Sequence, residues 1–274
     1  MEKVFDAHVH LSEHPDDSLI RFARMNSLAY TMNELLESMK RNNIEHGLLL
    51  SPPLQGSACL PNSQIIELCK KSRAVLSPVV TVDPSIEEVK SAIRLAEQNG
   101  KDVKAFKIRL GYVKASADSP VFDKLYDYAE AERLPVLFHT GDTASSDGDL
   151  SKSHPLTLDG LANKRKNLRI ILCHFGNPWF DDVAELIYKH PNVYTDISGL
   201  ITGETGYTAK YREWLARKIS EAIYYAGNGE KVLFGTDYPV SKHSDVLDLV
   251  KRLEIDEADK EKILWKNAER VFSL

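Results

Sequence analysis

The chain has 274 residues, of which 43% are hydrophobic, so it is long enough to bury a large core. Its formal net charge of −5 argues against a general nucleic-acid binder or a membrane-surface binder. No apolar run reaches the roughly 18 residues of a membrane-spanning helix, and the three cysteines include no Cys-x-x-Cys pair. This cysteine usage is typical of reduced thiols, and the N-terminus enters a strand without a signal peptide, so we expect a cytoplasmic protein.

Short apolar runs rich in β-branched residues alternate with segments of helical periodicity along the whole chain. The runs lie at residues 4–8, 46–50, 75–82, 103–110, 135–139, 169–174, 193–197 and 232–235. Most are almost continuously apolar, which is typical of parallel strands that are covered on both faces.

Helices are predicted between these runs. They lie at 32–41, 62–71, 85–98, 121–132, 156–164, 179–189, 211–225 and 244–253, with a final pair at 257–264 and 267–272. Eight strand–helix units in a chain of this length predict a (β/α)8 TIM barrel that forms a single domain over residues 1–274. A doubly wound open sheet is the alternative, but no glycine-rich phosphate loop follows the first strand.

Two histidines follow the first apolar run, in the segment Asp6-Ala7-His8-Val9-His10. Residues i and i+2 of a strand point to the same face, roughly 6.6–6.8 Å apart. Both imidazoles can then bend toward one cation and bind it at about 2.0–2.1 Å. Because a lone His-x-His pair is a weak signal, the pair indicates a metal site only if other strands supply further ligands.

Three more residues with metal-binding side chains stand at the downstream ends of later apolar runs: His139, His174 and Asp237. In a barrel, the C-terminal ends of all strands converge on one mouth, where active sites are built. These residues are therefore expected to meet His8 and His10 there. An alternative interpretation of Asp237 is a cap for the last helix, although a charged Asp directly after a buried strand is costly unless it is paired or coordinated.

The order and spacing of these segments resemble the amidohydrolase superfamily, specifically its amidohydrolase-2 branch, which also contains aminocarboxymuconate-semialdehyde decarboxylase and resorcylate decarboxylase. The matching segments, which cover nearly the whole chain, are Asp6-Ala7-His8-Val9-His10, His139-Thr140-Gly141, residues 154–159, His174-Phe175-Gly176, residues 191–196, Gly235-Thr236-Asp237-Tyr238-Pro239 and residues 267–272.

The resemblance implies a divalent metal, most often zinc, held by His8, His10, His139 and Asp237. One ion is favoured, and two remain an alternative. His174 would lie beside the metal and act on the substrate or on the metal-bound water. Asp237 would accept the proton of that water and return it to the leaving group.

Lys107 and Arg109 share one face at the end of the fourth strand and are candidates for binding the substrate. Some amidohydrolases have a carbamylated lysine on this strand that bridges two metals, so Lys107 could make the site binuclear, with His139 and His174 on the second ion. A structural ion pair is the third interpretation of the two side chains. Family members often have Lys-x-His-Pro here, whereas this chain has Lys107-Ile108-Arg109-Leu110.

The leading functional hypothesis is a metal-dependent hydrolase that acts on a small-molecule lactone, ester or amide through a metal-activated water. The alternative is a nonoxidative decarboxylase or hydratase of a small carboxylic acid on the same site, with Arg109 or Lys107 holding the carboxylate. A metal-dependent DNase is disfavoured because the fourth strand has no acidic residue, and a non-catalytic barrel is disfavoured because all the ligands are present. No nucleic-acid or membrane partner is expected, and a homodimer is left open.

Several further residues near the predicted mouth are candidates for supporting roles. Asp196 ends the seventh strand and could orient a ligand histidine or cap Ser198-Gly199. Cys173 precedes His174, so on a regular strand its side chain is expected to face the opposite way, into the packing layer. The long segment 140–155 and the glycine-containing segment 202–209 are candidate functional loops, the second as a lid.

Overall fold

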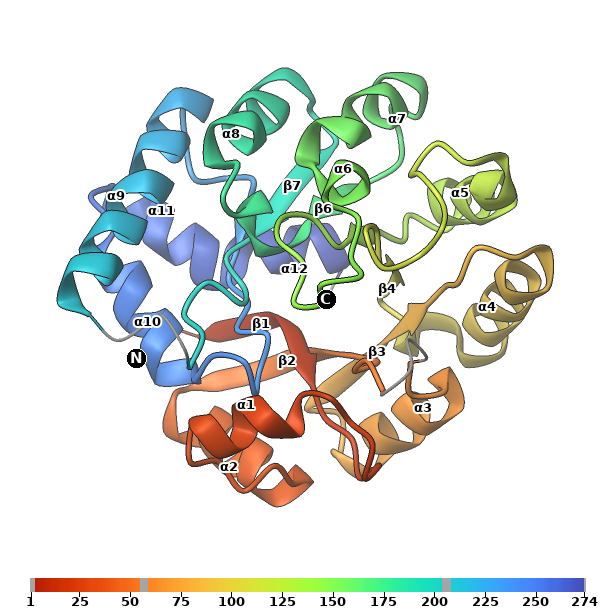
Figure 1. Cartoon of the computed structure of the whole chain (residues 1–274), viewed down its shortest axis with the longest axis horizontal. Helices are drawn as coiled ribbons and strands as arrows, with labels where there is room; N and C mark the ends of the chain where they lie inside the picture. Colours follow the sequence, from red (N-terminus) through yellow and green to blue (C-terminus); the bar gives the residue numbers. More distant parts are fainter. Residues whose placement is uncertain (1–2, 55–58, 204–207, 274) are drawn as a thin grey trace.

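The computed structural model describes residues 3–54, 59–203 and 208–273. Within these residues, eight parallel strands follow one another around a barrel in sequence order (Figure 1). They are β1 Val4–His10, β2 Ile44–Leu50, β3 Leu76–Thr81, β4 Ala105–Ile108, β5 Val136–Phe138, β6 Ile170–Leu172, β7 Val193–Asp196 and β8 Val232–Leu233. Main-chain hydrogen bonds from Ala7 N to Phe234 O (2.9 Å) and from Asp237 N to His8 O (2.7 Å) join β1 to the segment that directly follows β8. The predicted (β/α)8 barrel is confirmed.

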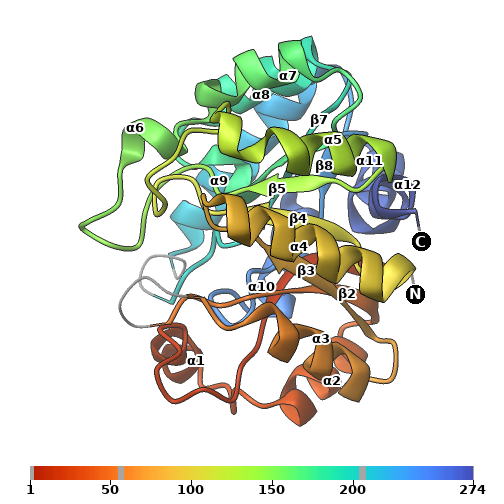
Figure 2. The same ribbon diagram turned by 90° about the vertical axis from the view of Figure 1, so that its right-hand side faces the viewer.

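Helices surround the barrel on its outside (Figures 1 and 2). They are α1 Ile20–Met25, α2 Met32–Arg41, α3 Asn62–Lys71, α4 Ile86–Asn99, α5 Asp123–Ala131, α6 Leu150–Ser153, α7 Asp159–Lys164, α8 Phe180–Lys189, α9 Ala209–Ala226, α10 His243–Arg252, α11 Glu257–Glu261 and α12 Asn267–Phe272. Short helical turns lie at Gly100–Asp102, Pro120–Phe122, Pro155–Leu158, Cys173–Gly176 and Lys262–Lys266.

Local sequence signals fix several helix ends. The side chain of Ser85 accepts a hydrogen bond from Glu88 N and begins α4, and that of Thr31 accepts one from Glu34 N and begins α2. Helix α4 ends before Gly100, which has a φ of 52°. Helix α1, in contrast, was not predicted, because its six residues are too few to show a helical period.

Strand side chains alternate between the barrel interior and the layer beneath the helices. The interior cluster includes Phe5, Leu48, Val79, Leu137 and Leu233, together with Ala268, Val271 and Phe272 of α12. Helix α12 therefore covers the N-terminal end of the barrel, and Figure 2 shows it at the end opposite to α1 and α6. The C-terminal ends of the strands remain available for a site.

A backbone irregularity in β1 points the His-x-His pair into the mouth. Ala7 packs in the barrel interior, so strict alternation would send His8 outward. The β1–β2 register instead shifts between Asp6 and Val9. As a result Val9 packs in the outer layer, while His8 and His10 both line the cavity at the mouth.

Strand β6 ends at Leu172, two residues earlier than predicted. Ile171 faces the barrel interior, and so does Cys173 two residues later. His174 and Phe175 then adopt left-handed backbone conformations, with φ of 63° and 48°. This turn brings His174 back to the mouth, although continued alternation would have sent it outward.

Candidate active site

His8 and His10 of β1 meet Asp237 at the centre of the mouth. Asp237 follows β8 and has a left-handed backbone conformation, with a φ of 60°. Its Oδ1 atom lies 3.0 Å from His10 Nε2 and 3.5 Å from His8 Nε2. These three side chains form one of the groups among the described residues whose donor atoms all lie within 4.8 Å of one another.

The far sides of both imidazoles are held by hydrogen bonds. His10 Nδ1 donates to the carbonyl oxygen of Leu50 at 2.9 Å, and His8 Nδ1 lies 3.2 Å from Asp196 Oδ2. Neutral imidazoles that donate from Nδ1 keep a lone pair on Nε2. Because that lone pair faces a carboxylate oxygen in each case, a cation between them suits the geometry.

Electrostatics favour the protonation states that a metal ligand set needs. Burial, reinforced by the charge of Lys107, lowers the pKa of His8 to about 4, so this imidazole is neutral at pH 7. Burial alone would raise the pKa of Asp237, but the contact with His10 and the neighbouring imidazoles bring it well below its usual range. For Asp196, the contact with His8 likewise outweighs burial and lowers the pKa well below normal.

Asp196 and Ser198, after β7, connect the two sides of the site. Asp196 Oδ1 accepts hydrogen bonds from His174 N at 2.9 Å and from Ser198 N at 3.0 Å. It therefore both orients His8 and caps the following turn, so the two predicted roles occur together. Ser198 Oγ lies 3.1 Å from His8 Nδ1 and 2.9 Å from His174 Nδ1. Sequence reasoning missed Ser198, because a serine after a strand is no signal by itself.

His139 and His174 form a second pair of rings beside the first. His139 Nε2 donates to Asp142 O at 2.9 Å, which leaves Nδ1 as the nitrogen with a lone pair. That Nδ1 lies 3.1 Å from His174 Nε2. The ring centroids of His174 and His8 are 5.0 Å apart. The five predicted strand-end residues therefore do meet at one mouth.

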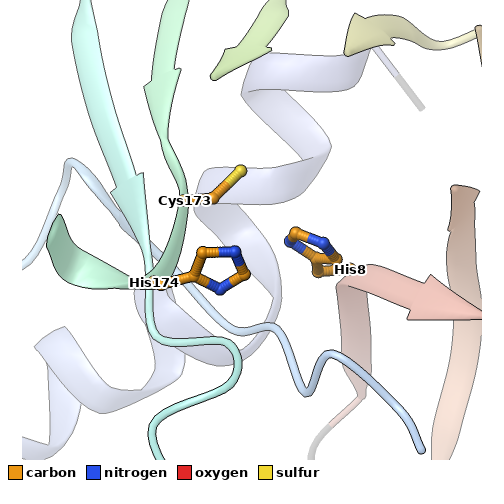
Figure 3. Close-up of side chains that lie close together, drawn as sticks. All are labelled: His8, Cys173 and His174. Carbon is orange, nitrogen blue, oxygen red and sulfur yellow. The ribbon is translucent and has the colours of Figure 1, made fainter. Parts of the chain in front are cut away.

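Cys173 corrects the sequence-based expectation. We predicted its side chain in the packing layer, but it faces the barrel interior two residues after Ile171, and the left-handed turn at His174 brings that histidine to the mouth as well. It forms a second group of potential metal ligands with His8 and His174, whose donor atoms also lie within 4.8 Å of one another. Figure 3 shows the three side chains directed into the same space.

Lys107 and Arg109 lie on the same face of the fourth strand and its end, as predicted, and both line the cavity. Lys107 is 5% exposed, and its Nζ lies 2.8 Å from Cys173 Sγ. Arg109 Nη2 lies 3.7 Å from Asp83 Oδ1. Their roles in carbamylation or substrate binding stay predictions.

A cavity of about 940 Å³ opens above these residues at the C-terminal ends of the strands. The segments after β4 and β5 line part of it. Tyr112, after β4, packs against His139 with ring centroids 4.8 Å apart, and its hydroxyl accepts a hydrogen bond from Ala144 N, after β5, at 2.7 Å. Residues 204–207 of the predicted lid lie outside the described residues. The cavity is large enough for a small organic substrate.

A parallel (β/α)8 barrel with histidines and an aspartate gathered at its mouth defines the class of metal-dependent barrel enzymes. The family model described as amidohydrolase matches residues 5–274, so the chain belongs to the amidohydrolase-2 family. The predicted resemblance is thereby confirmed.

Individual relatives include enzymes of two reaction types. Over 136 residues the chain is 29% identical to a gamma-resorcylate decarboxylase of Polaromonas sp. (strain JS666), a match that spans 46% of this chain and only 41% of that protein. Among solved structures, a dihydroxybenzoic acid decarboxylase from Polaromonas sp. JS666 with bound manganese is similar at a TM-score of 0.69 and 18% identity, over 100% of this chain and 98% of that one. A probable 2-pyrone-4,6-dicarboxylic acid hydrolase from Acinetobacter baumannii is similar at a TM-score of 0.70 and 17% identity, over 99% and 100%. At these identities, the structural matches show the fold.

In the part of the chain that the structure describes, no helix is both long and apolar enough to cross a membrane.

Proposed function

We propose that this chain is a metal-dependent hydrolase of a small-molecule lactone, ester or amide. In this proposal His8, His10, His139 and Asp237 hold one divalent ion, with zinc favoured by three imidazoles and a carboxylate. The observation that carries the proposal is the convergence of His8 Nε2 and His10 Nε2 on one oxygen of Asp237, at 3.5 and 3.0 Å. Ligand atoms of one metal ion have about this spacing, given metal–ligand bonds of about 2 Å.

Such an ion, when bound, would polarise a substrate oxygen and lower the pKa of a water molecule. The carboxylate of Asp237 lines the cavity and contacts His10, so it can accept a proton from a water molecule that a bound ion would acidify, and pass that proton to a leaving group. His174 faces His8 and His139 and can hold or transfer a proton at Nε2. Lys107 and Arg109 contribute positive charge to the cavity wall, which suits a substrate with a carboxylate.

Nonoxidative decarboxylation is the second candidate, favoured by the similarity to gamma-resorcylate decarboxylase. That reaction requires a cation to hold the carboxylate, which Arg109 or Lys107 would supply, and an acid to deliver a proton to carbon. Hydrolysis ranks first because the carboxylate of Asp237 lines the cavity beside His8 and His10, where it can accept a proton from an attacking water molecule.

Product analysis on purified protein tests the proposal. Elemental analysis should find close to one metal ion per chain, and the loaded protein should hydrolyse at least one member of a panel of lactones, esters and amides without releasing carbon dioxide. Chelation should abolish the reaction, and so should Asp237→Asn, whereas the matched change at the exposed Asp118, Asp118→Asn, should not.

His174→Ala should lose activity but keep most of one bound ion. Loss of about half of the bound metal in this variant would indicate two ions per site. Carbon dioxide release from hydroxybenzoic or dienoic acids without any hydrolysis would assign the second candidate instead.

A further inference from the structure

Cys173 lies at the centre of this mouth, and the proposed function does not use it. It is fully buried, and its Sγ points into the space between β6 and β1, where His174 and His8 also point (Figure 3). The three potential donor atoms lie within 4.8 Å of one another. Around a tetrahedral zinc ion, with a Zn–S distance of about 2.3 Å and a Zn–N distance of about 2.0–2.1 Å, ligand atoms lie about 3.5 Å apart. Small side-chain rotations would therefore close the group around an ion.

Burial raises the pKa of the Cys173 thiol well above its usual range, so the sulfur is protonated until an ion binds, and Lys107 partly opposes that shift. Lys107 Nζ lies 2.8 Å from Sγ and can donate a hydrogen bond to it. A donor of this kind stabilises the deprotonated sulfur that a metal requires, while burial alone stabilises the thiol. When an ion binds, the thiol proton leaves through the cavity and Lys107 keeps its own.

His8 is common to both groups of potential ligands, which are His8–His10–Asp237 and His8–Cys173–His174. Because Nδ1 of His8 is held by Asp196, only Nε2 is left to bind an ion. The two positions therefore compete for one nitrogen and are filled one at a time. The first offers oxygen and nitrogen, and the second offers sulfur and nitrogen, so ions of different softness prefer different positions.

We propose that His8, Cys173 and His174 form a second metal position beside the first, selective for thiophilic divalent ions such as Cd²⁺, for which Co²⁺ is the spectroscopic probe. Mn²⁺, a harder ion, would stay with His8, His10 and Asp237. This inference rests on the proposed function, because it assumes that the mouth binds a divalent ion. It means that the identity of the metal decides whether His174 is free to transfer protons.

Titration of the metal-free full chain with Co²⁺ tests the proposal. Visible absorption reports bound cobalt, and a near-ultraviolet charge-transfer band reports a cobalt–thiolate bond. We expect both signals in the wild type and in Cys69→Ser, a matched change of a buried thiol in α3. Cys173→Ser should keep the visible absorption and lose the charge-transfer band. Its affinity for Cd²⁺ should fall at least about tenfold, with Mn²⁺ affinity unchanged.

Two results separate the failure of this inference from the failure of the proposed function. Visible cobalt absorption in the wild type without a thiolate band would overturn the second position and leave the metal site intact. Absence of any cobalt, zinc or manganese binding would overturn the proposed function itself. If Cys173→Ser does not fold, X-ray absorption on the wild-type cobalt protein still tests the second position. It shows whether the cobalt ion has a sulfur ligand at about 2.3 Å.

Discussion

Asp196 contacts three parts of the site from one buried position. One of its oxygens faces His8 Nδ1, and the other accepts hydrogen bonds from the backbone of His174 and Ser198. The carboxylate thus fixes the tautomer of one predicted ligand and the turn that carries another side chain. At the scale of single residues, the site depends as much on this support as on the predicted ligands.

Asp196→Asn should weaken metal binding about 10–100-fold while leaving the fold intact. An amide can present an N–H group to His8 Nδ1, which would move the imidazole proton to Nε2 and remove the lone pair that faces Asp237. Isothermal titration with Zn²⁺ measures the affinity, and circular dichroism checks the fold. Unchanged affinity in this variant would show that His8 does not depend on Asp196.

At the scale of elements, the segments after β7 and β8 pack against each other without space for a larger residue. Gly199 has a φ of 67°, and a Cβ atom there would lie 2.8 Å from Asp237 Oδ2 and 3.0 Å from His174 Nδ1. The absence of a side chain at this position allows the loop after β7 to lie against both Asp237, after β8, and His174, after β6.

Gly199→Ala should therefore displace the Asp237 carboxylate and reduce metal affinity by about tenfold or more, in addition to the backbone cost of about 1–2 kcal/mol for a left-handed alanine. Gly160→Ala is the matched control, because no atom lies within 4 Å of the Cβ that it would add. Metal titrations and thermal unfolding of both variants are the measurements. Equal metal affinity in the two variants would contradict the steric argument.

Strand ends also show how far the sequence could predict the site. The positions of His139, Lys107 and Arg109 follow from simple alternation along their strands, and the structure agrees. The orientation of His8 depends on a register shift in β1, and that of His174 on the left-handed turn after β6. Neither backbone irregularity can be predicted from the residues around it, because each is set by how neighbouring strands pack.

At the scale of the whole molecule, the first strand and helix α10 are joined by a buried polar contact. His243 Nε2 lies 3.5 Å from Asp6 Oδ2, His243 Nδ1 lies 2.8 Å from Ser38 Oγ, and the ring stacks on Tyr238. Burial lowers the pKa of His243 from 6.5 to about 3, with a further contribution from Arg41. Burial raises the pKa of Asp6 to about 7.

These shifts predict a pH dependence of stability that His243→Gln should change. Between pH 6.5 and about 3, the unfolded chain takes up a proton on His243 and the folded chain does not. This contribution to stability is thus present above pH 6.5 and is lost as the pH falls, by up to about 1.4 kcal/mol per pH unit. The raised pKa of Asp6 has the opposite effect, because it stabilises the folded state at low pH. Asp6 is present in both the wild type and His243→Gln.

The difference in free energy of unfolding between the wild type and His243→Gln isolates the histidine. Denaturant unfolding of both metal-free proteins at a series of pH values should show this difference shrinking as the pH falls from about 6.5 to 5. Parallel curves would mean that His243 titrates alike in the folded and unfolded chains.

The sequence by itself determined the barrel, its strand order and the five strand-end residues at one mouth, because burial on both faces of parallel strands requires short, almost continuously apolar runs that the sequence shows directly. Only the tertiary structure decided that Asp196 and Ser198 support the histidines, and that Cys173 faces Lys107 inside the barrel. Those contacts join residues far apart in sequence, and side-chain directions at strand ends depend on backbone turns that periodicity does not record.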